Sequence, residues 1–329
     1  MTTTILLCTY NGESFLEDQL NSYLGQTELP TDLYVADDGS TDNTLSILKA
    51  FADKAPFPVQ IHQNKEKLGY AKNFLTHLQH TTGDLVFLSD QDDIWLSTKI
   101  EMHKREFVED PFLALTFSNA ELIDETNTII AKDYFSYLSM IDKWDNLTPD
   151  LFAFLLKNNT FVNGCFMTVS KKVRHKISAF FSDYPNYELE VGHDQFIAML
   201  VSLVFPHDFV REVLRVLTQH RKHDTQTMGN EYGETVGVRE IITTKQLTKR
   251  AHIQQHINHL QRMLGLATLL KQNDQKEQIS RFLSFHQSRL QQADQSLFSR
   301  SFFVFINAFT FNYHKRTQFP LKEMSRDLL

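Results

Sequence analysis

The chain has 329 residues, and its 33 Lys and Arg against 40 Asp and Glu give a formal charge of −7. Hydrophobic residues make up 42% and charged residues 22%, which excludes global disorder. The charge is unevenly spread, because residues 1–230 carry a net −13 and residues 231–329 a net +6. This split predicts two parts with different partners.

The sequence predicts a protein of the cytoplasm. It contains no uncharged apolar run of about 18 residues, so we expect no membrane-spanning helix, and its first residues lack the features of a signal peptide. Cys8 and Cys165 both stand among apolar residues. Two such cysteines fit a reducing compartment and argue against a disulfide framework or a zinc site.

Strand and helix signals alternate in the first third of the chain. Apolar runs and amphipathic patterns follow one another in the order Ile5–Cys8, Glu13–Leu24, Leu33–Ala36, Thr41–Lys54, Val59–His62, Tyr70–Gln79, Leu85–Ser89 and Ser97–Val108. This alternation predicts an α/β fold, built from βαβ units around a parallel sheet. Ligands of such sheets bind at the carboxyl ends of the strands.

The pattern loosens after residue 112. We expect strands at Leu113–Phe117, Phe166–Val169 and Val213–Gln219, a helix at Lys171–Phe181, and a helix start at Thr148, with a loop-rich excursion over 120–147. Beyond about residue 235 apolar residues recur at helical spacing, as in Ile253, Ile257 and Leu260. The chain therefore divides, by prediction, into a domain of residues 1–230 and a helical region of residues 231–329.

Polar, turn-forming clusters follow three of the predicted strands. They are Thr9-Tyr10-Asn11-Gly12-Glu13, Asp37-Asp38-Gly39-Ser40 and Ser89-Asp90-Gln91-Asp92-Asp93. Ordinary helix-capping turns would explain any one cluster, but five carboxylates at one sheet edge repel one another unless a cation lies among them. Oxygen ligands select Mg²⁺ or Mn²⁺, and such ions commonly share their coordination sphere with phosphate oxygens. The sequence thus predicts a metal–diphosphate site.

These motifs resemble those of the inverting nucleotide-sugar glycosyltransferases of family 2, which have the GT-A fold. The resemblance covers roughly residues 4–230 and includes the three clusters, the run Leu68–Phe74, the pairs Asn163-Gly164 and His193-Asp194, and the segment His220–His223. The Gln-Asp-Asp-Ile-Trp form at residues 91–95 and the late Arg-x-His at residues 221–223 are similar to bacterial polysaccharide rhamnosyltransferases. The implied fold is a mixed, mainly parallel sheet with helices on both faces and a helical C-terminal extension.

The resemblance implies a donor site. Thr9, Tyr10, Asn11 and Glu13 would line the nucleotide pocket, Asp37 would hydrogen-bond the base, and Asp38 would support that loop. Lys72 and Arg221 would reach phosphate groups, although both have the alternative of being solvated surface residues. Asp90 and Asp93 would contact ribose or sugar. The implied metal ligands, for Mg²⁺ or Mn²⁺, are Asp92 and His223.

The resemblance also implies a catalytic base and an acceptor side. Asp194 matches the carboxylate that removes the proton of the acceptor hydroxyl, with helix capping as its alternative. His193, Asn163, Gly164 and Trp95 are candidates for the acceptor or sugar pocket, and Trp95 is an equally good candidate for the core. His220 departs from the aromatic Tyr of many relatives.

The function predicted from the resemblance is transfer of a sugar, L-rhamnose from dTDP-rhamnose, to a growing, polyprenyl-linked glycan. A UDP-hexose donor is one alternative. A nucleotidyltransferase is a remoter one, because the loop after the first strand lacks a basic residue, and a catalytically silent scaffold is another. The aromatic segment with Phe302, Phe305 and Phe309 and the basic residues after it could rest on the inner membrane surface or pack as an ordinary helix. Nucleic acid is not an expected partner.

Overall fold

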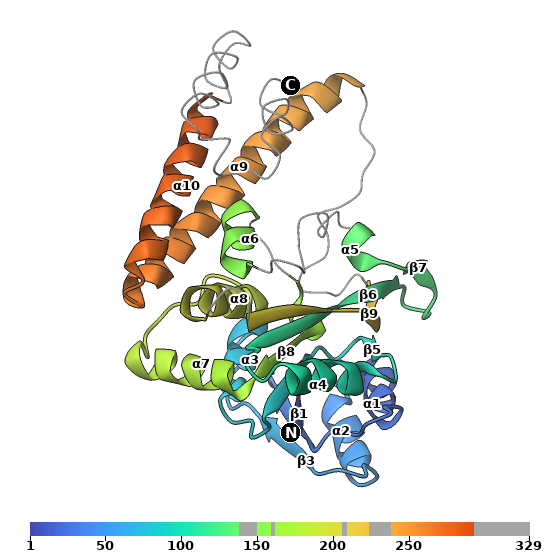
Figure 1. Ribbon diagram of the computed structural model, residues 1–329. Helices are drawn as coiled ribbons and strands as arrows, with labels where there is room; N and C mark the ends of the chain where they lie inside the picture. The colour runs from blue at the N-terminus through green and yellow to red at the C-terminus, as the bar shows by residue number, and fades with distance from the viewer. Residues whose placement is uncertain (138–149, 159–161, 206–208, 224–237, 293–329) are drawn as a thin grey trace. The chain divides into compact units, whose positions relative to one another are not determined.

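The computed structural model describes residues 1–137, 150–158, 162–205, 209–223 and 238–292 (Figure 1). The chain divides into two compact units. The first comprises Met1–Leu151 and Phe161–Asn230, and the second Phe152–Thr160 and Glu231–Leu329.

The first unit is built on one sheet, in which the described residues form nine strands. Their order is β3-β2-β1-β4-β8-β6-β9-β5, and β7 pairs with β6 outside this path. The strands are β1 (Thr3–Thr9), β2 (Asp32–Asp37), β3 (Val59–Gln63), β4 (Leu85–Ser89), β5 (Ile94–Trp95), β6 (Leu115–Ile123), β7 (Ile129–Ala131), β8 (Met167–Ser170) and β9 (Val210–Arg221).

Helices cover both faces of this sheet (Figure 1). Alternate strand residues such as Ile5, Val35 and Phe87 point to a core shared with α1 (Leu16–Leu24), α2 (Thr44–Ala52) and α4 (Lys99–Glu109). The opposite face meets α3 (Tyr70–Leu78), which packs on α8 (His193–Val204), and α8 packs on α7 (Lys171–Asp183). The central strands β1, β4 and β8 are buried along their whole length, which explains the apolar runs of β1 and β4, whereas β3 and β7 at the margins are partly exposed.

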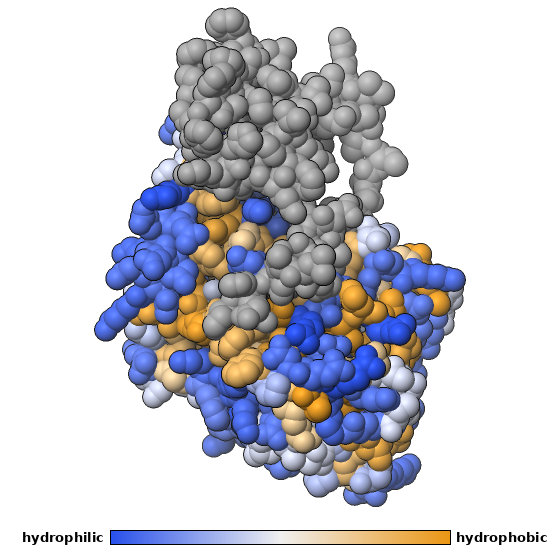
Figure 2. Space-filling view, viewed as in Figure 1, coloured by the Kyte–Doolittle hydropathy of each residue, from blue (hydrophilic) through white to orange (hydrophobic). Residues whose placement is uncertain are grey.

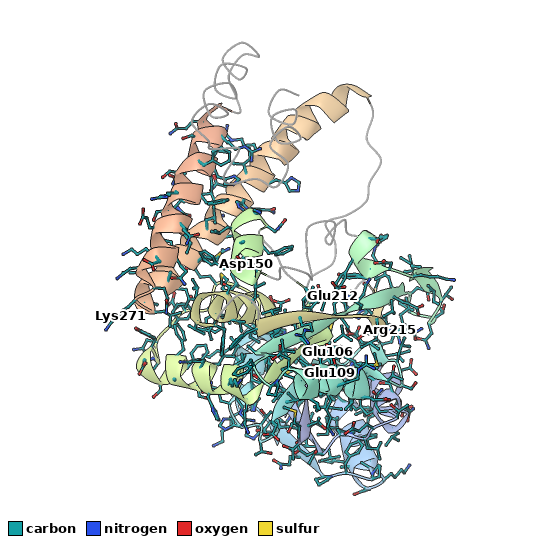
Figure 3. The ribbon with its side chains drawn as sticks, in the orientation of Figure 1. Glu106, Glu109, Asp150, Glu212, Arg215 and Lys271 are labelled. Carbon is teal, nitrogen blue, oxygen red and sulfur yellow. The ribbon has the colours of Figure 1, made fainter. Side chains whose placement is uncertain are left out.

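The end of α4 is tied to the start of β9 by ion pairs. Arg211 lies 3.4 Å from Glu106 and 2.9 Å from Asp110, and Glu106 is labelled in Figure 3. Polar residues cover most of the described surface visible in Figure 2, with smaller apolar areas among them. The two ion pairs of Arg211 therefore link α4 to β9 at the protein surface, where ion pairs contribute little to the free energy of folding.

The predicted elements differ from the observed ones mainly in the middle of the chain. The expected loop-rich excursion is wrong for its first part, because β6 continues to Ile123 and is followed by β7 and by α5 (Tyr134–Tyr137). The pairing of β6 with β9 shifts register at Ser118 and again at Asn119. These irregularities break the strict polar–apolar alternation that would have indicated a strand. Residues 138–149 lie outside the described part.

The second unit is helical in its described residues. It contains most of α6 (Leu151–Lys157), together with α9 (Val238–Leu269) and α10 (Asn273–Gln292). His256 and His259 of α9 lie with Nε2 3.0 Å from the main-chain oxygens of Leu156 and Leu155, at the end of α6. They thus cap carbonyl groups that have no partner within a short helix. The aromatic segment around Phe305 lies outside the described residues, and none of the helices searched in the described part is long and apolar enough to cross a membrane.

Candidate active site

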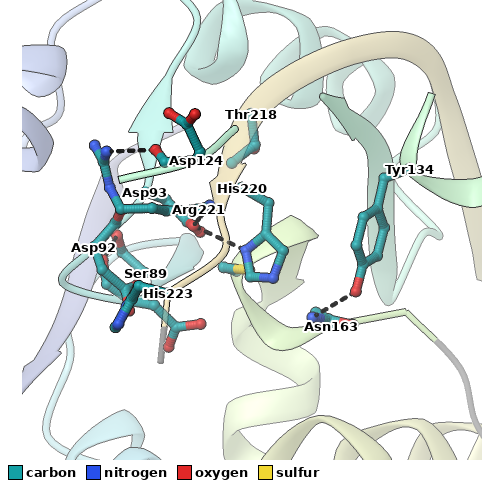
Figure 4. A network of polar contacts seen from close by, with 12 residues as sticks. Ser89, Asp92, Asp93, Asp124, Tyr134, Asn163, Thr218, His220, Arg221 and His223 are labelled. Atoms are coloured by element: carbon teal, nitrogen blue, oxygen red, sulfur yellow. Dashed lines mark hydrogen bonds and ion pairs between the residues drawn. The ribbon is translucent and has the colours of Figure 1, made fainter. Parts of the chain in front are cut away.

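Six described strands of the first unit end at one edge of the sheet: β3, which is parallel to β2, and the five strands whose loops concern the site, β1, β2, β4, β6 and β9. β1, β2 and β4 are parallel neighbours, and two successive antiparallel pairings through β8 bring β6, and with it β9, into the same direction. The loops after these strands therefore converge, although they come from residues 10, 38, 90, 124 and 222 onward. Figure 4 shows the part of this edge formed by β4, β6 and β9.

Asp37 is committed to the loop that follows it. Its carboxylate is fully buried and accepts hydrogen bonds from the Thr9 hydroxyl at 2.9 Å, from the main-chain N–H groups of Gly39 and Ser40, and from the Ser40 hydroxyl. Gly39 has φ of 86°, a conformation that favours glycine. Because four donors surround it, Asp37 shapes the turn, and the predicted contact with the base stays a prediction.

Asp38 connects β2 to the loop before α3. It accepts hydrogen bonds from the side-chain amide of Asn64 and from the main-chain N–H groups of Leu68 and Gly69, at 2.7 to 2.8 Å. The carboxylate is 3% exposed, so these three donors replace the water that it loses on burial. Asp38 thus holds the loop before α3, and its expected support of the base-binding loop stays a prediction.

Asn11 and Glu13 join the loops after β1 and β2. The Asn11 side-chain oxygen accepts the N–H of Thr41 at 2.8 Å, and Glu13 accepts from the N–H and the side chain of Asn43 at 2.9 and 2.8 Å. Asn11 has φ of 48°, which Asn tolerates better than most residues. These contacts hold the two loops together at the edge of the expected nucleotide pocket.

Tyr10, like Asn11 and Glu13, is exposed in the loop after β1. Its main-chain N–H and C=O both pair with the side-chain amide of Gln91, at 2.8 and 3.1 Å, which ties the loop to the one after β4. The Lys67 ammonium lies 3.5 Å from the centre of the Tyr10 ring, whereas Lys72 on α3 is exposed. Sequence analysis missed Lys67, because a lysine in an irregular polar loop has no distinguishing pattern.

Asp90 is the carboxyl group of the cluster whose charged form is most destabilised by its surroundings. Burial, together with the nearby charges of Asp92 and Asp93, raises the pKa of Asp90 to about 8. A carboxyl group in this state favours a proton, a cation or a hydrogen-bond donor from a ligand. It remains a candidate for contact with ribose or sugar.

Asp93 is neutralised within the protein. It is fully buried, and its Oδ1 lies 2.8 Å from Nδ1 of His220 and accepts the main-chain N–H of Arg221 at 3.1 Å. Although burial lowers the pKa of the His220 imidazole, the charge and hydrogen bond of Asp93 raise it to about 9. His220 is therefore a counter-ion that sequence analysis did not assign.

Cys165 lies beside the Asp93–His220 ion pair. Within the described residues, Asp93, Cys165 and His220 form the one group of three potential metal-binding side chains. The Cys165 thiol lies 4.0 Å from Nδ1 of His220, so the apolar surroundings expected for this cysteine are wrong. The direct ion pair already satisfies Asp93 Oδ1 and His220 Nδ1, and burial raises the pKa of the Cys165 thiol, which disfavours the thiolate that metals bind.

Asp92 and His223 form the pair expected to bind a metal. The Oδ2 atom of Asp92 lies 2.9 Å from Nε2 of His223, and the Phe15 ring packs on the imidazole at 4.8 Å. Adjacent ligands of an octahedral ion at 2.0–2.1 Å lie about 2.9 Å apart, so both spacing and ligand type fit Mg²⁺ or Mn²⁺.

Arg221 lies in the interior, so the alternative of a solvated surface residue is wrong. Its side chain has no exposed surface, and it donates to the main-chain oxygens of Asp92 at 2.8 Å, Asp124 at 3.1 Å and Glu125 at 3.4 Å (Figure 4). A fourth contact, 3.1 Å long, reaches the carboxylate of Asp18. The phosphate contact stays a prediction, and the geometry favours a role in positioning Asp92 and the end of β9.

Lys99 supplies a second buried cation beneath the cluster. Its ammonium donates to the main-chain oxygen of Cys165 at 2.6 Å and to the Thr218 hydroxyl at 2.8 Å, and it lies 4.2 Å from the Trp95 ring. Burial lowers the pKa of Lys99 to about 8. Trp95 is 3% exposed and packs on Tyr23, so its position is that of the core alternative. The acidic edge thus has counter-ions of its own.

Asp194 lies at the start of α8, as the resemblance implied. Its Oδ1 accepts the main-chain N–H of Gln195 at 2.7 Å, which is a helix-end contact. A Cβ on Gly192 would lie 2.4 Å from Asp194 Oδ1 and 3.4 Å from the Tyr70 hydroxyl, so these groups crowd one point. Burial raises the pKa of Tyr70, and the charges of Asp194 and Asp90 raise it further. Tyr70 therefore lies within electrostatic reach of both the donor cluster and the expected base.

The remaining candidates lie beside Asp194. His193 is 4% exposed and stacks on Phe74 at 3.9 Å, and neither ring nitrogen has a hydrogen-bond partner among the described residues. A Cβ on Gly164 would lie 2.1 Å from His193 Nε2, so only glycine fits there without displacement. The Asn163 amide approaches the Tyr134 hydroxyl at 3.4 Å. The acceptor roles of these residues stay predictions.

Known proteins share this sequence pattern and this fold. Residues 4–177 match the family described as Glycosyl transferase family 2. The dTDP-rhamnosyl transferase RfbG of Shigella flexneri is 29% identical over 196 residues, covering 58% of this chain and 63% of that protein. The UDP-Glc:alpha-D-GlcNAc-diphosphoundecaprenol beta-1,3-glucosyltransferase WfgD of Escherichia coli is 30% identical over 129 residues, covering 39% and 49%. These matches span between about half and two thirds of the relatives' lengths.

A solved structure bears on the fold alone. TarS 1-349 of S. aureus, in complex with UDP-GlcNAc, is 14% identical and superposes with a TM-score of 0.55, covering 100% of this chain and 82% of that one. The predicted α/β fold, with a mixed, mainly parallel sheet and C-terminal helices, is confirmed. Since the family match covers more than half of its residues, the chain belongs to glycosyl transferase family 2.

Proposed function

We propose that this protein is a metal-dependent, inverting glycosyltransferase that moves a sugar from a nucleoside diphosphate to a hydroxyl group of a glycan. The observation that carries the proposal is the pairing of Asp92 with His223 at 2.9 Å, at the sheet edge where the loops after β1, β2, β4, β6 and β9 converge and where ligands of such sheets bind. A bound Mg²⁺ or Mn²⁺ would neutralise negative charge that develops on the leaving diphosphate.

The proposed base is Asp194. In an inverting transfer the acceptor oxygen attacks the anomeric carbon from the face opposite the leaving group, and the carboxylate takes the hydroxyl proton. The bond from the anomeric carbon to the diphosphate oxygen breaks as the new glycosidic bond forms. The location of Asp194 at a helix start, on a different element from the Asp90–Asp93 cluster, supports this division of roles.

The proposed donor is dTDP-rhamnose. The similarity to the Shigella flexneri dTDP-rhamnosyl transferase supports it, whereas the similarity to the Escherichia coli UDP-Glc-dependent enzyme supports a UDP-hexose. That second relative also supports a polyprenyl diphosphate-linked acceptor, because its name specifies a diphosphoundecaprenol substrate. Association of the basic C-terminal region with the inner membrane surface belongs to the same proposal, and anionic vesicles in a flotation assay would test it.

The decisive experiment measures products formed by the full chain. With Mn²⁺, each of dTDP-rhamnose, UDP-glucose and UDP-GlcNAc is supplied, and transfer or slow hydrolysis should release nucleoside diphosphate. Release of pyrophosphate in reactions supplied with a sugar phosphate and a nucleoside triphosphate would instead identify a nucleotidyltransferase. Failure to bind any nucleotide sugar would favour the silent scaffold.

Two variants test the assignment of roles. Asp194→Asn should lower transfer by about a hundredfold or more, the usual contribution of general base catalysis, and should leave donor binding intact. Asp53→Asn changes an exposed carboxylate at the end of α2 and should behave as wild type. If Asp194→Asn keeps near-normal transfer, another residue is the base.

A further inference from the structure

We propose that His220 contacts the transferred sugar, with Nε2 of its imidazole hydrogen-bonded to an oxygen of the pyranose. The inference deepens the proposed function and rests on it. It concerns a residue to which the family resemblance assigned no role in the site. Three features of the first unit support it: a fixed ring orientation, an open nitrogen, and walls suited to a neutral sugar.

The orientation of the His220 ring is fixed by its contact with Asp93. Nδ1 of His220 lies 2.8 Å from the buried Asp93 carboxylate, which is itself held by the main-chain N–H of Arg221. Because Nδ1 and Nε2 lie on opposite sides of an imidazole, this contact directs Nε2 away from Asp93. A carboxylate bound to one ring nitrogen of a histidine commonly determines whether the other nitrogen is protonated and what it can bind.

The Nε2 atom is open. Among the described residues it has no hydrogen-bond partner, and it is not one of the side-chain nitrogens that are shut off from solvent without a partner. The side chain as a whole keeps 13% of its surface exposed. A nearly enclosed imidazole with one accessible nitrogen has the form of a ligand contact rather than of a completed structural ion pair.

The surroundings of Nε2 suit a sugar. The Tyr134 and Phe166 rings meet the imidazole edge-on, at 5.3 and 5.4 Å between centroids. In Figure 4 the Tyr134 phenol and the Asn163 amide lie on the side of the imidazole that faces away from Asp93. A hydroxyl and an amide beside aromatic rings match the alternating hydroxyl and C–H surface of a pyranose. A diphosphate would fit beside the Asp92–His223 pair instead, where the proposed metal ion would offset its charge.

The location agrees with the path of the reaction. Burial raises the pKa of the Tyr134 phenol, and the charges of both Asp93 and Asp194 raise it further. Tyr134 is thus within electrostatic reach of the carboxylate behind His220 and of the proposed base. Since the Tyr134 ring also meets the His220 imidazole, the proposed sugar contact lies near both the Asp93 carboxylate and the proposed base.

Calorimetry with the full chain separates sugar recognition from nucleotide recognition. The ratio of Kd for dTDP to Kd for dTDP-rhamnose, and for UDP to UDP-glucose, measures what the sugar contributes in the presence of Mn²⁺. His220→Phe should reduce this ratio by about tenfold to a hundredfold, the usual effect of losing a hydrogen bond to a charged donor, with the Kd of the free diphosphate unchanged. His220→Gln, which keeps an N–H donor, should recover part of the loss.

His103→Gln is the matched control, because His103 is also a fully buried imidazole but bonds only Thr116 among the described side chains. It should leave the ratio unchanged even if it lowers the melting temperature. An unchanged ratio in His220→Phe, or equal weakening of diphosphate and nucleotide sugar, overturns the proposal. A wild-type protein that binds nucleotide sugar more tightly than diphosphate but transfers nothing overturns the proposed function instead, and leaves this inference standing.

Discussion

Asp92 Oδ2 and His223 Nε2 lie 2.9 Å apart, although 131 positions separate them in the chain. The contact joins two distant strands at this edge of the sheet, because Asp92 lies in the loop after β4 and His223 lies just after β9. Three pairings of neighbouring strands lie between β4 and β9, so their register determines this distance. The pair is therefore a sensitive measure of whether the fold is intact at the site.

Metal binding should depend on both members of this pair. In wild type, Mn²⁺ at a hundredfold excess over its Kd should stabilise the protein by about 2.7 kcal/mol. Asp92→Asn and His223→Gln should each remove most of that shift in a thermal melt, while the melting temperature without metal stays close to wild type. Equal stabilisation of all three proteins by Mn²⁺ would show that the ion binds elsewhere.

Arg221 should behave as a positioning residue. Arg221→Lys keeps the charge but cannot reach three main-chain oxygens and Asp18 at once, so buried carbonyl groups lose their donors. We expect a loss of about 1–3 kcal/mol in the free energy of unfolding and weaker Mn²⁺ binding. Urea denaturation and Mn²⁺ titration measure the two effects.

The comparison for Arg221 is Asp18→Asn, which removes one of its contacts and leaves the main-chain contacts in place. Its effect on both quantities should be smaller. If Arg221→Lys binds Mn²⁺ normally but binds nucleoside diphosphate weakly, the side chain contacts phosphate and the positioning role is wrong.

Gly192→Ala should displace the proposed base with little other change. The backbone at Gly192 has φ of −59° and ψ of 156°, which alanine adopts freely, but its Cβ would lie 2.4 Å from Asp194 Oδ1. We expect a fall in kcat of about tenfold or more with donor Kd unchanged, because small displacements of a catalytic group are costly. Gly25→Ala, whose Cβ would meet its neighbours no closer than 3.7 Å, is the control.

His77 should make stability fall in mild acid. Burial, and then the neighbouring charges of His62 and His80, lower the pKa of His77 to about 4. In the unfolded chain His77 is therefore protonated near pH 6.5, whereas in the folded chain it is protonated only near pH 4. Stability is complete above the unfolded pKa and declines as pH falls through this window, by at most about 3 kcal/mol.

Urea denaturation at pH 7.5 and pH 4.5 tests the role of His77. His77→Gln should lose less stability between the two pH values than wild type, whereas His175→Gln, at an exposed position on α7, should lose as much as wild type. A His77→Gln protein with the full wild-type decline would assign the acid sensitivity to other buried histidines, such as His103.

The first four strands and helices could be predicted because one pattern per element sufficed. β5 and the second half of β6 could not. β5 has two residues, and β6 passes through polar Ser118 and Asn119 at the point where its register with β9 shifts. Tertiary pairing, not local pattern, makes these segments strands.

The site divides in the same way. Asp92 and His223, which the family resemblance implied together, are in contact, and Asp194 lies at the start of α8, while their roles stay predictions. Lys99 and Arg221 have sequence surroundings typical of solvated residues, yet both are buried. Their acceptors are largely main-chain oxygens, which every residue possesses, so no sequence pattern could have identified them. Part of the repulsion inferred among five carboxylates is thus offset by cationic groups of the protein itself.

The last two residues of β9 limit which changes in sequence the site can tolerate. His220 and Arg221 are consecutive, so the pleat sends the imidazole to Tyr134 and Phe166 and the guanidinium to Phe15 and Asp18. A single insertion or deletion in the last part of β9 would exchange the two faces and bring the wrong cation to each. Substitutions at position 220 can therefore retune the sugar side alone, while changes of length there would undo the sugar side and the metal side together.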